Sequence, residues 1–284
     1  SLFENTKNLT QKDVEAVLTS TSDNSKYLSS IISELTGLTP KISHSVESLC
    51  NSGANSAVSA FAYIASGLAD VALVTGAERF DSPGRILEWD KSRGQYKHPI
   101  YWSSMFTKAH MRKYGTTKED LAIVSAKNHK NATANPYAYF EKEYSIDEIM
   151  QSKNLTEDIR LLDCSLPCSG SAAILLASEE IAKKITDCPI WITGIGQKTI
   201  SAGFTKNTDL TTMKSTKDAV TDAYKMSNIQ PRDVDVAEIH DAFTICEIIE
   251  LEDLGFAKKG KGSSYARNCY ETQDRKINPR GGLI

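Results

Sequence analysis

Apolar and polar residues follow two different periods along this chain, and the two periods alternate. Short apolar or strictly alternating runs predict strands, whereas apolar residues spaced three and four apart predict helices. Strands are predicted at Val14–Leu18, Ile42–Val46, Asp70–Val74, Ala172–Ala177, Ile190–Ile195 and Val234–Ile239. Helices are predicted at Lys26–Leu35, between Ser52 and Gly67, at Thr216–Met226 and at Thr244–Leu254. Strands that alternate with helices indicate an α/β layered fold.

The stretch from Pro83 to about Asn154 breaks this alternation. It is rich in Lys, Tyr, Trp and Asn and has little strand character. It carries two helix-like pieces, SSMFTKAHMRKYG (103–115) and TKEDLAIVSAKNH (117–129). We therefore interpret it as an insertion laid over the sheet core.

An internal repeat links the two ends of the chain. NLTQKDVEAV (Asn8–Val17) and NIQPRDVDVA (Asn228–Ala237) share the Asn, the basic-Asp-Val triplet and the acid that follows it. The second copy is preceded by a complete predicted helix, the first only by Ser1–Lys7. The register predicts a protein of two related halves, with the first strand and most of the first helix missing from this sequence.

Composition narrows the class of protein. The chain has 284 residues, of which 40% are hydrophobic and 24% charged, as in ordinary globular proteins. A formal charge of −3 argues against non-specific nucleic-acid binding. Apolar runs fall short of the ~20 residues of a membrane span, and no leader for secretion is expected. The six cysteines are sparse, which favours reduced thiols in a cytoplasmic protein. The Cys164-x-x-x-Cys168 spacing is wider than a usual zinc knuckle, so no metal is expected.

One cysteine has a context that favours chemistry. In SVESLCNSGANSAVSAF (Ser45–Phe61), Cys50 lies between a predicted strand and the helix that opens at Ser52. The positive end of that helix dipole is expected to lower the thiol pKa and favour the thiolate. The alternative is a small core side chain, because cysteines among Ala, Ser and Val are usually buried fillers.

Several segments together resemble the thiolase superfamily. ESLCNSGANSAVSAFAYIASGLADVALVTGAE (47–78) resembles its nucleophile segment. KNHKNATANPYA (127–138) and EIHDAFTICEIIELEDLGF (238–256) are similar to the sterol-carrier-protein-type branch and to archaeal-like acetyl-CoA C-acetyltransferases. INPRGGLI (277–284) resembles the glycine run before the family's Gly-His-Pro motif. The resemblance covers nearly the whole chain.

The resemblance implies a duplicated α/β fold with five layers, α/β/α/β/α, and an inserted loop domain. Residues 1–82 with 160–187 are then the N-terminal half, and residues 83–159 are the inserted domain on the acyl-CoA side. Residues 188–284 are the C-terminal half, truncated before the Gly-His-Pro motif. The family's next catalytic histidine and its terminal cysteine have no counterpart here, so these residues alone are expected to be catalytically incomplete.

The resemblance also implies the catalytic residues. Cys50 matches the acyl-accepting nucleophile, whose own backbone N–H contributes to an oxyanion hole. His240 matches the position that helps polarise the thioester carbonyl, and the two are expected to share one pocket. The alternative for His240 is a turn histidine hydrogen-bonded to Asp241.

Other candidates concern substrate binding. Lys97, Lys127 and Lys130 are hypotheses for contacts with coenzyme A phosphates, although surface lysines usually only solvate. Gly281 and Gly282 are assigned to substrate binding from the glycine run. His129 is interpreted as a packing or capping residue.

These assignments predict a thiolase-type acyltransferase of lipid or isoprenoid metabolism. It would condense two acetyl-CoA molecules, or cleave a 3-oxoacyl-CoA, through an acyl-cysteine intermediate. A coenzyme A thioester is the expected substrate, no separate cofactor is expected, and a homodimer or homotetramer is the expected assembly. One alternative is an aldolase- or lyase-type enzyme. Another is a non-catalytic subunit of an acyl-CoA multienzyme complex with hydroxymethylglutaryl-CoA synthase and a zinc-ribbon/OB-fold acyl-CoA-binding protein.

Overall fold

The computed structural model describes residues 2–21, 25–79, 98–201 and 208–284. The chain divides into two compact units, which are described separately. The first contains Ser1–Leu87 and Pro167–Ile192, and the second contains Glu88–Leu166 and Thr193–Ile284. The division into two halves and an inserted loop domain stays a prediction. Among the helices in the described ranges, none has both the length and the apolar character needed to cross a membrane.

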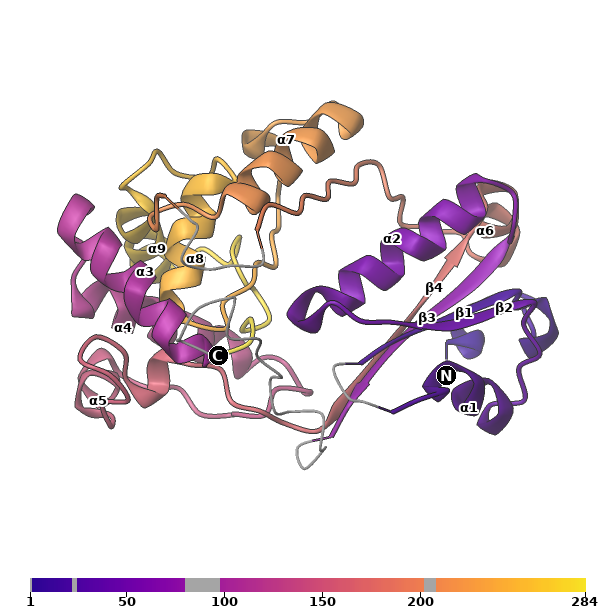
Figure 1. Ribbon diagram of the computed structural model, residues 1–284, viewed down its shortest axis with the longest axis horizontal. Coiled ribbons are helices and arrows are strands. Elements are labelled where there is room, and N and C mark those ends of the chain that lie inside the picture. Colours follow the sequence, from indigo (N-terminus) through magenta and orange to yellow (C-terminus); the bar gives the residue numbers. More distant parts are fainter. Residues whose placement is uncertain (1, 22–24, 80–97, 202–207) are drawn as a thin grey trace. The chain divides into compact units, whose positions relative to one another are not determined.

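The first unit is built on a sheet of four strands in the order β2-β1-β3-β4 (Figure 1). The strands are β1 (Ala16–Ser20), β2 (Ile42–Val46), β3 (Val71–Glu78) and β4 (Gly170–Ala177). The central strand β1 runs parallel to β2 and β3, whereas β4 pairs antiparallel with β3. The helices are α1 (Leu28–Leu35), α2 (Ser52–Ala65) and α6 (Glu179–Ile185). The parallel pairs need helical crossovers, which explains the strand–helix alternation of the sequence.

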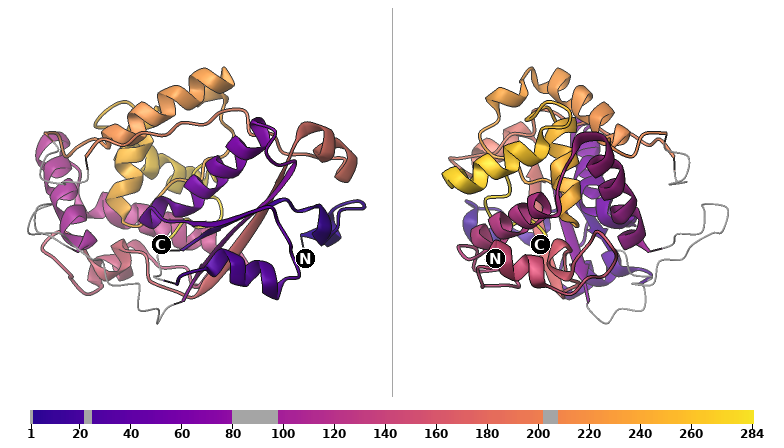
Figure 2. Two further views of the ribbon diagram at one scale, coloured as in Figure 1. Left: turned by 45° about the vertical axis from the view of Figure 1, so that its right-hand side comes forward. Right: turned by 90° about the vertical axis from the view of Figure 1, so that its left-hand side faces the viewer.

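Alternate residues of β1 enter two different apolar clusters, so both faces of this strand are covered. Leu18 packs with Ala60 of α2 in one cluster. Val17 packs with Val14 and Leu38 in the other. Figures 1 and 2 show α2 lying across the strands of the sheet, which it contacts at β1 and β3. This packing fixes the N-terminal end of α2, the end nearest Cys50.

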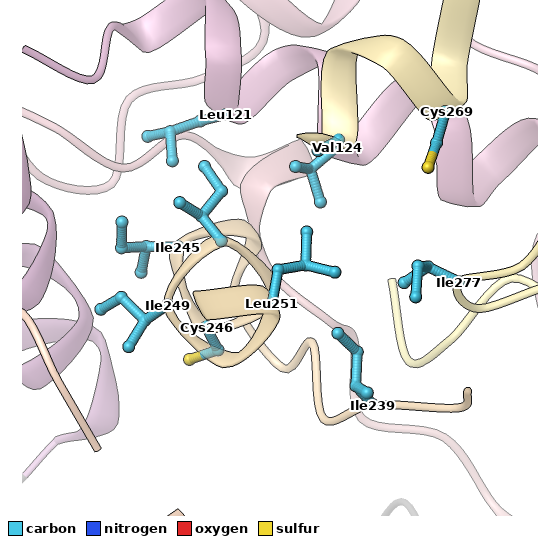
Figure 3. Packing of buried hydrophobic residues seen from close by; sticks show 11 residues of the cluster. Leu121, Val124, Ile239, Ile245, Cys246, Ile249, Leu251, Cys269 and Ile277 are labelled. Carbon is cyan, nitrogen blue, oxygen red and sulfur yellow. The ribbon is translucent and has the colours of Figure 1, made fainter. Parts of the chain in front are cut away.

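The second unit is mainly helical. Its helices are α3 (Pro99–Tyr114), α4 (Lys118–Ala132), α5 (Ile146–Gln151), α7 (Lys214–Ser227), α8 (Thr244–Asp253) and α9 (Gly262–Thr272). Every residue of α8 is buried. Figure 3 shows Leu121 and Val124 of α4 and Cys269 of α9 gathered around this helix. Because α8 is enclosed on all sides, its charged residues have to find partners inside the protein.

Local signals explain where two of these helices begin. Thr117 and Asp120 form a reciprocal capping box at the start of α4, and Ser145 and Glu148 do the same for α5. Each pair satisfies backbone N–H groups that the first helical turn leaves without partners.

The internal repeat has the same local structure in both copies. Short 3-10 turns span Gln11–Asp13 and Pro231–Asp233, and in each the aspartate carboxylate accepts a hydrogen bond from the backbone N–H three residues earlier. The Asn at the start of each copy has a left-handed backbone, with φ of 58° at Asn8 and 57° at Asn228. The remaining 3-10 turns are Phe3–Asn5, Leu49–Asn51 and Leu161–Asp163. The sequence repeat is therefore also a structural repeat.

Two predicted strands are wrong within the described residues. Residues 190–195 form no ladder, and 234–239 forms only one bridge, between Ala237 and Ile277. Gly194 instead lies so close to α7 that a Cβ would overlap the carbonyl oxygen of Ala223. Ile190, Trp191, Ile192 and Val236 are exposed. An apolar pattern predicts a strand only where a neighbouring strand is present to pair with it.

Candidate active site

Cys50 lies where the sequence places it, at the passage from a strand to a helix. β2 ends at Val46, a 3-10 turn covers Leu49–Asn51, and α2 follows at Ser52. The side chain is exposed. It lines a cavity of about 680 Å³ in the first unit. The cysteine is therefore accessible and is not a buried filler.

This cavity is walled mainly by small residues. Its lining comes from the end of β1, the C-terminal part of β3, the first residues of β4 and the turn that carries the cysteine. The small residues in this lining include Ser52, Gly53, Gly76, Ala77, Gly170 and Ser171. The arrangement leaves room for a small apolar group such as an acyl chain next to Cys50.

The expected lowering of the Cys50 pKa is wrong. Burial by the surrounding protein atoms raises the pKa of this thiol above its usual value, and the backbone N–H of Cys50 lowers it by a smaller amount. The loss of water around the thiolate outweighs the stabilisation that the Cys50 backbone N–H provides. The turn therefore fixes the position of the Cys50 thiol and does not keep it ionised.

His240 lies in the second unit, directly before the buried helix α8. Its side chain is exposed, and its backbone N–H donates to Oε2 of Glu250 at 3.0 Å. The neighbouring protein withholds water from the imidazolium and lowers the pKa of His240, which favours the neutral ring. Cys50 belongs to the first unit and His240 to the second, so their sharing of one pocket stays a prediction.

Asp241 bonds to other partners than its neighbouring histidine. Its carboxylate accepts a hydrogen bond from Asn128 Nδ2 at 2.7 Å and from the Leu283 backbone N–H at 2.6 Å. Burial, reinforced by the nearby charge of Glu247, raises the pKa of Asp241 to about 7. Asp241 thus joins α4, the segment before α8 and the glycine run into one buried network.

Gly281 and Gly282 have backbones that other residues rarely adopt. Their φ angles are 103° and 64°, in the region that favours glycine. A Cβ on Gly281 would lie 2.5 Å from that of Ala132, and one on Gly282 would overlap the Asp241 carboxylate. Both glycines are required by this close packing, and their contact with substrate stays a prediction.

The three candidate lysines occupy different environments. Lys127 is 3% exposed, and its ammonium lies 3.1 Å from Glu247 Oε1 and 3.2 Å from the Ile277 carbonyl. The surface position expected for Lys127 is therefore wrong, because this charge is needed inside the protein. Lys130 is partly exposed and lies 4.0 Å from Glu143. Lys97 lies outside the described residues.

His129 is a packing residue, as predicted. Its ring is buried and lies edge-on to Phe140 and Tyr144, with centroid distances of 5.7 and 4.7 Å. Neither ring nitrogen has a hydrogen-bond partner among the residues that the structure describes. Burial lowers the pKa of His129 to about 4, so the ring is neutral at ordinary pH.

Sequence reasoning missed two residues close to His240. Glu250 accepts the His240 backbone N–H, and Asn128 holds the Asp241 carboxylate. Asn128 could have been identified from the sequence, because it belongs to the KNHKNA run that carried the family resemblance. Glu250 lies in the other segment of that resemblance, 238–256, but it was not singled out, because a glutamate in a helix usually faces water.

Comparisons with known proteins agree with this arrangement. The family model described as beta-ketoacyl synthase, N-terminal domain, matches residues 2–99, and the model described as thiolase C-terminal domain-like matches residues 196–284. The chain is 35% identical over 269 residues to an acetyl-CoA acetyltransferase of Methanothermobacter thermautotrophicus, a match that covers 91% of this chain and 70% of that relative.

Two further likenesses complete the comparison. Sterol carrier protein 2 of Bos taurus is 33% identical to this chain over 263 residues. The match covers 84% of this chain and 48% of the Bos taurus protein. The solved structure of the Ltp2-ChsH2(DUF35) aldolase has a TM-score of 0.85 at 24% identity, covers 96% of this chain and 75% of that chain, and shows likeness of fold. The chain therefore belongs to the thiolase family, and the thiolase fold predicted from its motifs is confirmed.

Proposed function

We propose that this protein transfers acyl groups between coenzyme A thioesters, with Cys50 as the acyl carrier. The observation that supports this most directly is the place of Cys50, an accessible thiol beside a cavity of small residues at a strand-to-helix turn. The 35% identity to an archaeal acetyl-CoA acetyltransferase supports acetyl-CoA as the substrate.

The proposed reaction has two steps. The Cys50 thiolate attacks the carbonyl carbon of acetyl-CoA, forms acetyl-Cys50 and releases coenzyme A as its thiol after protonation. A base then removes an α-proton from a second acetyl-CoA, and the resulting enolate attacks the carbonyl carbon of acetyl-Cys50. This forms the carbon–carbon bond of acetoacetyl-CoA and returns the thiolate. The reverse sequence cleaves a 3-oxoacyl-CoA.

His240 is proposed to act on the second substrate. With a lowered pKa its ring is neutral near pH 7, and a neutral imidazole N–H donates a hydrogen bond to a thioester oxygen without giving up the proton. Such a donor stabilises the negative charge that develops as the enolate forms. Loss of His240 should therefore slow the second step more than the first.

The two alternative functions predict different products. An aldolase- or lyase-type enzyme would cleave a 3-hydroxyacyl thioester, and Cys50 would not be acylated. A non-catalytic subunit would cleave no thioester and would not be acylated at Cys50. The partners implied by the family resemblance, hydroxymethylglutaryl-CoA synthase and a zinc-ribbon/OB-fold acyl-CoA-binding protein, stay predictions, as does the dimeric or tetrameric assembly.

The proposal is tested by incubating the full-length protein with acetyl-CoA alone and mapping the products by peptide mass spectrometry. We expect one acetyl group on Cys50 and free coenzyme A in equal amount. The Cys50→Ala variant should carry no acetyl thioester. Acetylation of Cys168 or Cys188, which are also exposed, in preference to Cys50 would refute the assignment.

A further inference from the structure

The residue before the nucleophile has an unfavourable backbone. Leu49 has a φ of 53°, a region that residues with a large side chain rarely enter, because the β-carbon crowds the carbonyl that follows. Leu49 is also 39% exposed, so apolar packing of its own side chain does little to hold this conformation. Other contacts must hold the turn.

Those contacts converge on Ser52, the first residue of α2. Ser52 is 4% exposed, and its hydroxyl makes two hydrogen bonds across the turn. It accepts the Ser48 backbone N–H at 2.8 Å and donates to the Leu49 carbonyl at 2.7 Å. One side chain therefore fixes the backbone on both sides of the Leu49 φ angle.

A second layer supports this arrangement from the next turn of α2. Asn55 Nδ2 donates to the Ser48 hydroxyl at 2.6 Å, and Asn55 Oδ1 accepts from Asn51 Nδ2 at 3.0 Å. The Leu49 backbone N–H donates to Glu47 Oε1 at 2.8 Å. The side chains on either side of Cys50 are thus tied to one another and to the rigid start of the helix.

We propose that Ser52, supported by Asn55, is a positioning residue that holds the Leu49–Cys50 turn so that the Cys50 sulfur and the Cys50 backbone N–H face the same carbonyl group. This inference rests on the proposed role of Cys50 as acyl acceptor. Acyl transfer needs a sulfur and an N–H donor aimed at one carbonyl, whereas alkylation needs only an accessible thiolate. Loss of the Ser52 hydroxyl should therefore affect acyl transfer far more than alkylation.

The test compares two reagents on each exposed thiol of the full-length protein. Phenyl thioacetate reports acyl transfer, since the thiolate attacks its carbonyl carbon and thiophenolate leaves. Iodoacetamide reports alkylation. Cys168 and Cys188 are exposed and serve as reference thiols in the same molecule. In the parent protein, the ratio of acylation to alkylation should be at least roughly tenfold higher at Cys50 than at the reference thiols.

In Ser52→Ala this ratio at Cys50 should fall to within about threefold of the reference thiols, and Ser52→Thr, which keeps a hydroxyl, should restore it. Asn55→Ala should lower it part of the way. Ser59→Ala is the matched control. The Ser59 hydroxyl also donates to a backbone carbonyl, that of Asn55 at 2.8 Å, and Ser59 lies about two helical turns beyond Ser52. This variant should leave the ratio unchanged.

An unchanged ratio in Ser52→Ala, or a parent ratio equal to that of the reference thiols, would overturn the proposal. The Ser52→Ala variant is judged unfolded if its Cys50 is alkylated as fast as in urea. In that case the ratios measured for Asn55→Ala and Ser52→Thr test the proposal instead. Acetyl-CoA is assayed separately. A parent that responds to phenyl thioacetate but not to acetyl-CoA would refute the proposed function while leaving the positioning role in place.

Discussion

The thiol of Cys50 is subject to two opposing influences. Surrounding protein atoms destabilise the thiolate by keeping water away, its own backbone N–H stabilises it, and the first effect is larger, so the pKa is raised. Only the thiolate is nucleophilic. The protein therefore holds this residue mostly as the neutral thiol near pH 7.

We expect the alkylation of Cys50 by iodoacetamide to accelerate with pH in proportion to the thiolate fraction. The rate should rise about tenfold per pH unit from roughly pH 7 to pH 9. Peptide mass spectrometry of samples quenched over time at each pH measures it. A rate that levels off below about pH 8 would contradict burial as the dominant influence on this pKa.

His129 is the second residue whose environment makes a specific prediction. Within the described part of the chain, neither nitrogen of its buried ring has a hydrogen-bond partner. His129→Phe should raise the free energy of unfolding by about 1 kcal/mol near pH 7, because an apolar ring leaves no polar atom without a partner. The parent should also lose stability as the pH falls from 6.5 towards 4, because the folded pKa of about 4 favours proton uptake by the unfolded chain, and the variant should lose less.

Urea unfolding at pH 7 and pH 5 measures both effects. His44→Phe is the control, because His44 Nε2 lies 2.9 Å from the Tyr63 hydroxyl and the loss of that bond should destabilise the protein. A His129→Phe variant less stable than the parent by as much as the His44→Phe variant would show that His129 has a polar role.

At the scale of elements, α4 and α8 are joined by buried charge. Lys127 of α4 contacts Glu247 of α8, whose Oε2 also accepts from Asn128 and from Asn278. These bonds explain why α4 is buried on its polar side as well as on its apolar side. The sequence could not predict this burial, because helical spacing marks polar positions as solvent-facing and the partner Glu247 lies far away in the chain.

Lys127→Ala should lower the free energy of unfolding by about 3 kcal/mol, because it leaves the Glu247 carboxylate buried without its cation. Lys130→Ala, a few residues away on the same helix and partly exposed, should change it by less than about 0.5 kcal/mol. Chemical denaturation of both variants gives the comparison. Equal effects from the two would mean that Lys127 is not a structural lysine.

Two buried acids beside His240 make stability depend on pH. Burial raises the pKa of Glu250 to about 8 and that of Asp241 to about 7. Between pH 6.5 and 8.5 the folded state therefore holds protons that the unfolded state has already released, and stability falls as the pH rises. The loss should be about 2 kcal/mol across this window.

Glu250→Gln should remove most of this slope, as measured by urea unfolding at intervals across the window. Glu252→Gln is the control. Burial alone would raise the pKa of Glu252, but hydrogen bonds from His110 and the Gly262 backbone N–H hold it at about 2. Loss of the Glu252 carboxylate should lower the free energy of unfolding at every pH in the window and leave its dependence on pH unchanged. A slope that persists in Glu250→Gln would contradict the raised pKa of Glu250.

At the scale of the whole molecule, the sequence predicted those elements whose formation depends on residues close together in the chain. β2 has the predicted bounds, Ile42–Val46, and α8 differs from its predicted bounds by one residue. The strands expected at 190–195 and 234–239 did not form, because strand pairing depends on partners that a local pattern does not contain. The same limit explains why Cys50 was placed correctly while its pKa was not: the turn is local, but the burial around it is tertiary.

The internal duplication relates the two units of the chain. Two copies of one turn, each begun by a left-handed Asn and closed by an Asp, lie in different units of the chain. Cys50 lies in the first unit and His240 in the second. The proposed function assigns the first step of catalysis to Cys50 and the stabilisation of the enolate in the second step to His240. This division of roles is its central claim.

The most direct test is the thiolysis of acetoacetyl-CoA by the full-length protein and by its Cys50→Ala and His240→Ala variants, with acetyl-Cys50 formation from acetyl-CoA measured alongside. We expect Cys50→Ala to lose both activities, by about a thousandfold or more in thiolysis. His240→Ala should lose thiolysis by at least about a hundredfold while still forming acetyl-Cys50. Thiolysis at the parent rate in Cys50→Ala, or equal loss of both activities in His240→Ala, would contradict this division of roles.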